Sequence, residues 1–239
     1  MTPRLPDRTP DITPTPSRAT DDFVYAPPQS PYLTLLHYDQ DIVVANKPSG
    51  LLSVPGKALA HQDSLYTRLA RVWPDIRVVH RLDMATSGVI VFARHKAAQS
   101  HLSKQFQARS VNKTYIAEVY GQLPEPQGEV DLPLRCDWPR RPKQMVCHQQ
   151  GKASLTHYEV ADYCAQTHSS RVLLHPVTGR SHQLRVHMLA LGCPILGDRL
   201  YGHEASQQAA ARLQLHALRI SLYHPNSQAR IQFECAAPF

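Results

Sequence analysis

Residues 80–92 read HRLDMATSGVIVF, a charged loop followed directly by an apolar run. Residues 89–92 are unbroken apolar positions, which predicts a buried strand. Asp83 would then lie on a loop beside that strand, where partial loss of solvent suits a carboxylate to act as a nucleophile or a base. A second interpretation makes Asp83 the cap of a turn and residues 86–88 ordinary turn positions. Taken by themselves, these residues favour the turn and leave the chemical role open.

The segments around this stretch mix strands and helices without regular alternation, which predicts an α+β domain with a largely antiparallel sheet. Apolar and β-branched runs predict strands at 42–45, 113–121, 154–164, 171–177, 214–222 and 229–234. Helical spacing predicts helices at 96–108 and at 182–191, the second ending at Gly192. A third helix is predicted to begin after an N-cap at Asp63, with Leu65, Leu69 and Val72 on one face.

Length and composition bound the class of protein. The chain has 239 residues, and no apolar stretch is long enough to cross a bilayer, which excludes a helical membrane protein. Its five cysteines form no CxxC pair, so neither a zinc knuckle nor a disulfide framework is indicated, and a reduced cytoplasmic location is expected. The net charge of +7 is compatible with a polyanionic partner.

The first 31 residues differ in composition from the rest. They hold eight of the 20 prolines and show no apolar period, which predicts a flexible arm at 1–31 and a single domain at 32–239. The arm contains three arginines and four aspartates, so the remainder of the chain carries a net charge of +8. The basic character therefore belongs to the domain.

A second polar stretch, TGRSHQLRVH, spans residues 178–187. On a helix, His182 and Arg185 lie on neighbouring turns, and a guanidinium there can hold a carboxylate ionised and oriented through paired hydrogen bonds. One alternative makes His182 and His187 metal ligands, but five residues are a poor spacing for one helical face and no further ligand completes a site. The other alternative is an exposed basic helix face.

A basic loop, RCDWPRRPK, spans residues 135–143. An aromatic side chain beside arginines suits contact with unstacked RNA bases. The alternative is a solvated loop from which Trp138 packs into the core of the domain. The chain contains no G-x-G-x-x-G, no GxxxxGK[ST] and no G-x-S-x-G motif, so nucleotide-cofactor and serine-hydrolase interpretations lose their main support.

Three segments together, HRLDMATSG, KTYIAEVYG and TGRSHQLRVHMLALGCPILGD, resemble the RluA family of pseudouridine synthases over about residues 33–239. The stretches KPSGLLSVPG, VDLPLRCDWPRRPKQMVC and HMLALGCPILGDRLY are similar to the branch of that family that acts on both ribosomal RNA and tRNA. Related branches carry an S4-like RNA-binding domain before the catalytic domain, and here a proline-rich arm stands in that place.

The resemblance implies a single catalytic domain with a mixed, largely antiparallel sheet and an active site in a basic cleft. It implies isomerisation of loop uridines in 23S ribosomal RNA and in the tRNA anticodon stem-loop, or in one of these, without a metal or an organic cofactor. Asp83 matches the catalytic aspartate, Arg185 the arginine that pairs with it, and Tyr115 the tyrosine that stacks on the uracil and assists removal of the C5 proton. Attack at C1′, attack at C6 and a glycal route all remain open.

The resemblance also implies RNA as the partner, and a monomer without an obligate protein partner is the default expectation. Arg81 matches the residue that fills the space left by the flipped base, a step that costs a few kcal/mol. The further candidates for RNA contact are His80, Arg140, Arg141, Lys143, Arg180 and His182. Two rival functions are a non-catalytic RNA-binding module and a nucleoside hydrolase. The first would have lost catalytic residues that are present here, and the second normally needs another carboxylate to activate water.

Overall fold

The structure is a computed structural model that describes residues 24–239, in which ten strands form one sheet. The strand order is β1-β2-β4-β11-β5-β10-β9-β6, with β12 on β11 and β3 on β4. All pairings in this sheet are antiparallel except that of β4 with β11. The predicted α+β class with a largely antiparallel sheet is therefore confirmed.

The sheet consists of strands β1 (Leu35–Tyr38), β2 (Ile42–Lys47), β3 (Arg77–Val78), β4 (Ser87–Ala93), β5 (Asn112–Tyr120), β6 (Gln127–Asp131), β9 (Leu155–Cys164), β10 (Ser169–Pro176), β11 (Leu215–Tyr223) and β12 (Arg230–Glu234). A separate hairpin pairs β7 (Leu134–Cys136) with β8 (Gln144–Val146). The helices are α1 (Leu65–Ala70), α2 (Lys96–Gln107), α3 (Gln183–Ala190) and α4 (Glu204–Gln208). No helix within residues 24–239 is long and apolar enough to span a membrane.

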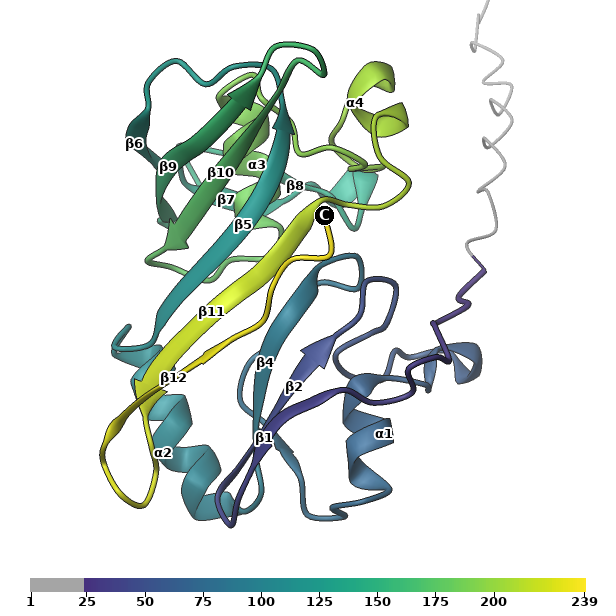
Figure 1. Ribbon diagram of the computed structural model, residues 1–239, viewed down its shortest axis with the longest axis vertical. Coiled ribbons are helices and arrows are strands. Elements are labelled where there is room, and N and C mark those ends of the chain that lie inside the picture. The colour runs from purple at the N-terminus through teal and green to yellow at the C-terminus, as the bar shows by residue number, and fades with distance from the viewer. Residues whose placement is uncertain (1–23) are drawn as a thin grey trace, which may run out of the picture.

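The long strands β5 and β11 cross the middle of the molecule and join two halves (Figure 1). In one half, alternate residues of β2 and β4 pack against α2 on one face of the sheet and against α1 on the other. This burial on both faces explains why residues 89–92 are continuously apolar instead of alternating. In the other half, α3 packs Leu184 and Met188 against β5 and β10.

Most of the predicted elements are confirmed within two residues of their expected ends, but the start of α1 differs. Its N-cap is Ser64, whose hydroxyl accepts from the Thr67 amide at 3.1 Å. Asp63 instead accepts hydrogen bonds from Arg68 at 2.7 and 2.8 Å. Val72 lies beyond the last turn and is 58% exposed, so its predicted place on the buried face is wrong.

The predicted arm falls largely outside the described residues, since the description begins at Val24. Residues 24–31 pack on the domain instead of standing apart from it. Tyr25 donates to the Asp63 carbonyl at 2.7 Å and accepts from the Leu52 amide at 3.0 Å. Arg68 donates to the Pro28 carbonyl at 2.8 Å. The boundary at residue 31 stays a prediction, and Tyr25 and Pro28 on its N-terminal side contact the domain.

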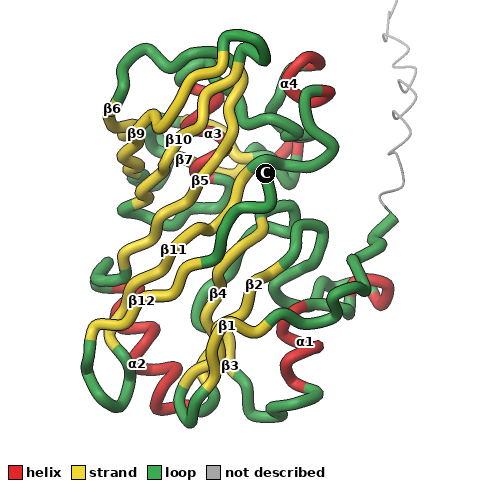
Figure 2. The backbone as a smooth tube through the Cα atoms, viewed as in Figure 1, coloured by secondary structure: helices red, strands yellow, loops and turns green. Residues whose placement is uncertain are grey.

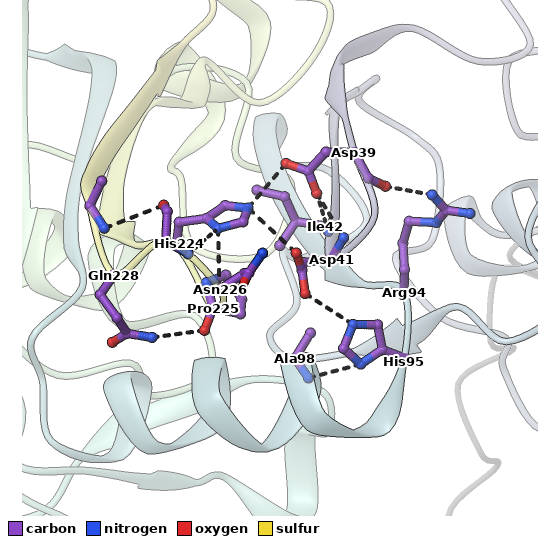
Figure 3. Close-up of polar contacts among 12 residues, drawn as sticks. Asp39, Asp41, Ile42, Arg94, His95, Ala98, His224, Pro225, Asn226 and Gln228 are labelled. Atoms are coloured by element: carbon purple, nitrogen blue, oxygen red, sulfur yellow. Dashed lines mark hydrogen bonds and ion pairs between the residues drawn. The ribbon is translucent and has the colours of Figure 1, made fainter.

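Hydrogen bonds among histidines and aspartates link the β1–β2 turn, the β11–β12 turn and the start of α2 (Figure 3). Asp39 accepts from His37 at 2.7 Å and from His224 at 3.1 Å, and Asp41 lies 3.0 Å from His95 at the start of α2. Burial acts to raise the pKa of Asp39, but hydrogen bonds from His37, His224 and two backbone amides lower it to about 2. The ionised carboxylate thus links the β1–β2 turn to the β11–β12 turn.

Candidate active site

Asp83 lies on the loop between β3 and β4, and this loop is bound along its length to residues 47–53. Ser53 donates to the Leu82 carbonyl at 2.7 Å and accepts from the Leu82 amide at 3.1 Å. The Gly50 amide donates to the Met84 carbonyl at 2.9 Å. These contacts on both sides of Asp83 hold its backbone in one place, which is what a positioned carboxylate requires.

The Lys47 side chain also holds the Asp83 loop, through hydrogen bonds to backbone carbonyls. Its side chain is fully buried, and Nζ donates to the carbonyls of Pro48, Leu51 and Met84 at 2.9, 2.7 and 3.0 Å. Burial lowers the pKa of Lys47 to about 7, whereas Asp83 acts to raise it. Three carbonyl acceptors match the three donors of an ammonium, so this residue is a buried cross-link and not a surface cation.

The Gly88 position fixes how the Asp83 loop enters the sheet. Gly88 has φ +115°, and a Cβ there would lie 2.3 Å from the Ala217 carbonyl oxygen of β11. Only glycine therefore allows the close parallel contact between β4 and β11. Next to it, His216 Nδ1 lies 2.9 Å from the Ser87 hydroxyl, and His216 Nε2 lies 2.9 Å from the Cys235 carbonyl on the segment that runs along β11 after β12 (Figure 2).

The wall opposite Asp83 is the start of α3. Arg185 is buried there and donates through Nε and Nη2 to the two oxygens of Asp198, both at 2.7 Å. The prediction that these paired hydrogen bonds would go to Asp83 is wrong. Arg185 reaches Asp83 with its remaining nitrogen, Nη1, at 3.8 Å from Oδ2. Asp198 thus orients the guanidinium, and Asp83 receives the free end of it.

His182 faces the same carboxylate oxygen. Its Nε2 lies 3.9 Å from Asp83 Oδ2, and its Nδ1 lies 2.7 Å from the Tyr201 hydroxyl. As N-cap of α3 it has φ +52°, a left-handed conformation that is uncommon for residues other than glycine. Burial lowers the pKa of His182. Two nitrogen groups, from His182 and Arg185, thus converge on Oδ2 of Asp83.

Tyr115 reaches this cleft from β5. Burial, together with the charge of Asp83, raises the pKa of Tyr115 well above its ordinary value. The phenol is therefore protonated at neutral pH, which favours stacking over a role as a base. The cleft is lined by Arg81, Leu82, Asp83, Thr86, Lys113, Tyr115, Pro176, Thr178, Gly179, Arg180, His182, Gln183, Leu184, Arg185 and Leu215. It brings together the three predicted catalytic residues and the predicted RNA contacts Arg81, Arg180 and His182.

A basic groove continues from the cleft between the end of α2 and β5. The cations along it are Arg81, Arg109, Lys113 and Arg180. Burial of the Lys113 side chain, which lines this groove, lowers its pKa. The groove therefore offers a row of positive charges beside the cleft, which is suited to a phosphodiester backbone.

His80 lies in this groove but is already bound to the protein. Its Nε2 accepts from the Val91 amide at 3.0 Å, and its ring stacks on Phe106 with centroids 4.8 Å apart. Burial lowers the pKa of His80 to about 3, so the ring is neutral at neutral pH. The structure therefore gives this residue a role in fixing the loop onto β4 and no positive charge with which to attract phosphate.

The remaining predicted RNA contacts lie outside the cleft, on the β7–β8 hairpin. Trp138 is 62% exposed at its tip, so the alternative that placed it in the core is wrong. The Arg141 guanidinium lies 4.5 Å from the centre of the indole ring, and Arg140 pairs with Asp137 at 2.7 Å. Lys143 lines a separate depression between the hairpin and α3. The hairpin thus presents a stacked aromatic–arginine pair to solvent.

Sequence reasoning missed several residues that build the site. Asp198 and Tyr201 lie in the quoted stretch 187–201 and Lys47 begins the quoted stretch 47–56, yet none had been given a role. Residues that act on the Asp83 site from a distant loop carry no local pattern.

His187, which the sequence offered as a possible metal ligand with His182, is buried. Its ring is hydrogen-bonded to the Thr156 hydroxyl at 2.9 Å.

Comparison with known proteins shows the family to which this chain belongs. Residues 41–190 match the RNA pseudouridylate synthase family. The chain is 54% identical over 215 residues to the dual-specificity RNA pseudouridine synthases RluA of Salmonella typhimurium and of Escherichia coli, which covers 90% of this chain and 98% of each relative. The relative from Vibrio cholerae is 52% identical over 85% of this chain and 82% of its own length.

Solved structures show the same fold. The human RNA pseudouridylate synthase domain containing 1 superposes with a TM-score of 0.72 at 30% identity, over 87% of this chain and 84% of that one. The human domain containing 4 gives a TM-score of 0.70 at 28% identity, over 86% and 88%. Fold and sequence together define an RNA pseudouridine synthase, an isomerase that converts uridine in RNA to pseudouridine. Within that class, the chain belongs to the RluA family.

Proposed function

We propose that this enzyme isomerises unpaired uridines in both 23S ribosomal RNA and the tRNA anticodon stem-loop, with Asp83 as the nucleophile. The observation that carries the proposal is the position of Asp83. Among the described residues that line the cleft it is the only carboxylate, and it faces Arg185 and His182 at 3.8 and 3.9 Å. Its loop is fixed by contacts on both sides, so little reorganisation is needed when the base arrives.

The reaction rearranges bonds within one nucleotide. Attack by the Asp83 carboxylate at C1′ or at C6 allows the N1–C1′ bond to break, after which the uracil turns and C5 bonds to C1′. If Asp83 has attacked C1′, the carboxylate leaves C1′ as the C5–C1′ bond forms; if it has attacked C6, the bond between the carboxylate and C6 breaks after C5 has bonded to C1′. On either route C5 loses its proton and N1 gains one. Tyr115 stacks on the base during the turn, while the buried wall of the cleft limits access of water. A hydrolase would need a second carboxylate to activate water, and the lining offers none.

The basic groove and the hairpin support RNA as the substrate. Arg81 is exposed at the junction of cleft and groove, where it can occupy the space that the flipped uridine leaves in the stack. Unpaired loops cost less to remodel than duplex, which favours stem-loops. Action on both RNA classes is proposed because the curated relatives, at 52–54% identity, are named dual-specificity enzymes.

The test is chemical mapping of pseudouridine in a ribosomal RNA fragment and a tRNA anticodon stem-loop after incubation with the protein. The wild type should modify a loop uridine in each RNA. Asp83→Ala should modify neither, and Asp75→Ala, at an exposed aspartate beyond α1, should behave as the wild type. Product from Asp83→Ala would refute the role of the nucleophile. Modification of one RNA alone would refute dual specificity, and release of free uracil would indicate a hydrolase.

A further inference from the structure

The Tyr201 hydroxyl lies between the β7–β8 hairpin and the active site. It accepts a hydrogen bond from the Gln144 backbone amide at 2.7 Å, and it lies 2.7 Å from His182 Nδ1. Among the described residues, these are the two groups within hydrogen-bonding distance of this oxygen. Because an amide can only donate, His182 Nδ1 is the one of these two groups that can accept the phenolic proton.

This arrangement decides which nitrogen of His182 carries a proton. If Nδ1 accepts from Tyr201, the proton of the neutral ring lies on Nε2. Nε2 is the atom that faces Asp83 Oδ2 at 3.9 Å. Burial raises the pKa of Tyr201 to about 12 and lowers that of His182, so the phenol keeps its proton and the imidazole is neutral at neutral pH.

Tyr201 itself is rigidly held. Its backbone amide donates to Asp198 Oδ1 at 3.1 Å, and the same carboxylate binds Arg185 at 2.7 Å. The Arg185 guanidinium also lies 5.0 Å from the centre of the Tyr201 ring, within cation–π range. The segment 198–201 therefore places both groups that face Asp83: Arg185 through a salt bridge and His182 through a hydroxyl.

We infer that Tyr201 is a positioning residue for pseudouridine formation: its hydroxyl holds His182 as an Nε2–H donor toward Asp83 Oδ2, opposite Arg185 Nη1. Both nitrogen groups approach Oδ2, at 3.8 and 3.9 Å, which is longer than a hydrogen bond, so they act on this oxygen through charge and dipole. His182 has φ +52°, and its ring lies edge-on to that of Tyr201, with an angle of 85° between the two planes. This inference rests on the proposed role of Asp83.

The test uses Tyr201→Phe, which keeps the ring above Arg185 and removes only the hydroxyl. We expect kcat on the tRNA stem-loop to fall roughly tenfold, as for the loss of one positioning hydrogen bond, with KM changed less than twofold. The matched control is Tyr163→Phe, because Tyr163 makes the same contact with His168 Nδ1, at 3.0 Å, on an exposed part of the sheet. Its kcat should equal that of the wild type.

Two further measurements separate positioning from a general effect on packing. Long-range ¹H–¹⁵N NMR, assigned by comparison with His182→Gln, should show the Nε2–H tautomer of His182 in the wild type and a shift toward Nδ1–H in Tyr201→Phe. In a His182→Gln background, Tyr201→Phe should lower kcat less than twofold, because Tyr201 acts through His182.

The results that would overturn this inference differ from those that would contradict the proposed function. An Nδ1–H tautomer in the wild type overturns the inference, whatever the variants do. It is equally overturned by unchanged kcat in Tyr201→Phe, or by a tenfold loss that persists in the His182→Gln background. A wild type that forms no pseudouridine contradicts the proposed function and leaves the tautomer measurement as the test of the geometry.

Discussion

Asp198→Asn gives the sharpest energetic test of how the active site is built. The Asp198 carboxylate is buried and accepts from Arg185 twice, at 2.7 Å, and from the amides of Leu200 and Tyr201 at 3.0 and 3.1 Å. Asparagine offers one oxygen, and its amide group would face a donor. Arg185 would then keep only Asp83, at 3.8 Å, as a counter-charge, and removing one partner of a buried pair typically lowers the free energy of unfolding by about 3–5 kcal/mol.

The assay is urea unfolding at pH 7, followed by circular dichroism, with pseudouridine formation measured well below the transition. A loss of that size should move the midpoint down by roughly 1–2 M. The matched control is Glu234→Gln, which breaks the exposed Arg219–Glu234 pair at 2.8 Å and should change stability by less than about 1 kcal/mol. If Asp198→Asn lost no more than Glu234→Gln, Asp198 would not be the group that holds Arg185.

Three other perturbations follow from the structure. Lys47→Met leaves three carbonyls around the buried side chain without their donor, and it should lower the free energy of unfolding by about 3 kcal/mol or more. The control Lys96→Met, at an exposed lysine, should change that free energy by no more than about 0.5 kcal/mol in the same urea assay. Gly88→Ala should prevent the β4–β11 contact and abolish activity. Gly192 also has a positive φ, but a Cβ there would meet open space, so Gly192→Ala should lower the free energy of unfolding by only about 1–2 kcal/mol, measured by thermal unfolding. The pKa of His80 is about 3 in the folded protein and about 6.5 in the unfolded chain, so between these pH values the unfolded chain binds the additional proton and stability falls as pH falls. Urea unfolding across pH 6.5 to 3 should show a shallower loss for His80→Gln, and equal slopes would contradict the assignment.

The sequence was most informative where a local pattern has one physical cause. The run at 89–92 and the spacing of Ala98, Leu102 and Phe106 predicted β4 and α2 because burial on a strand or helix repeats with a fixed period. The short α4 and the β7–β8 hairpin have too few apolar residues to show a period, and neither was predicted.

The residues expected to be catalytic all line the cleft, and the family resemblance named each of them, but their supporting contacts could not be predicted. Arg185 was expected to hold a carboxylate, yet nothing in the sequence shows that Asp198 and not Asp83 receives both hydrogen bonds. Lys47 was overlooked because lysine is rarely buried, and only the folded chain brings three carbonyls around its ammonium. Long-range partners are set by the fold, so they appear only with it.

The central claim is that the Asp83 carboxylate performs the chemistry in a site that binds RNA without it. The most direct measurement is the single-turnover rate of pseudouridine formation by Asp83→Asn on the tRNA stem-loop at saturating enzyme, with RNA affinity measured in parallel. We predict a rate lower by more than about 10³-fold with affinity within threefold of the wild type. A rate within tenfold of the wild type would contradict the assignment of Asp83.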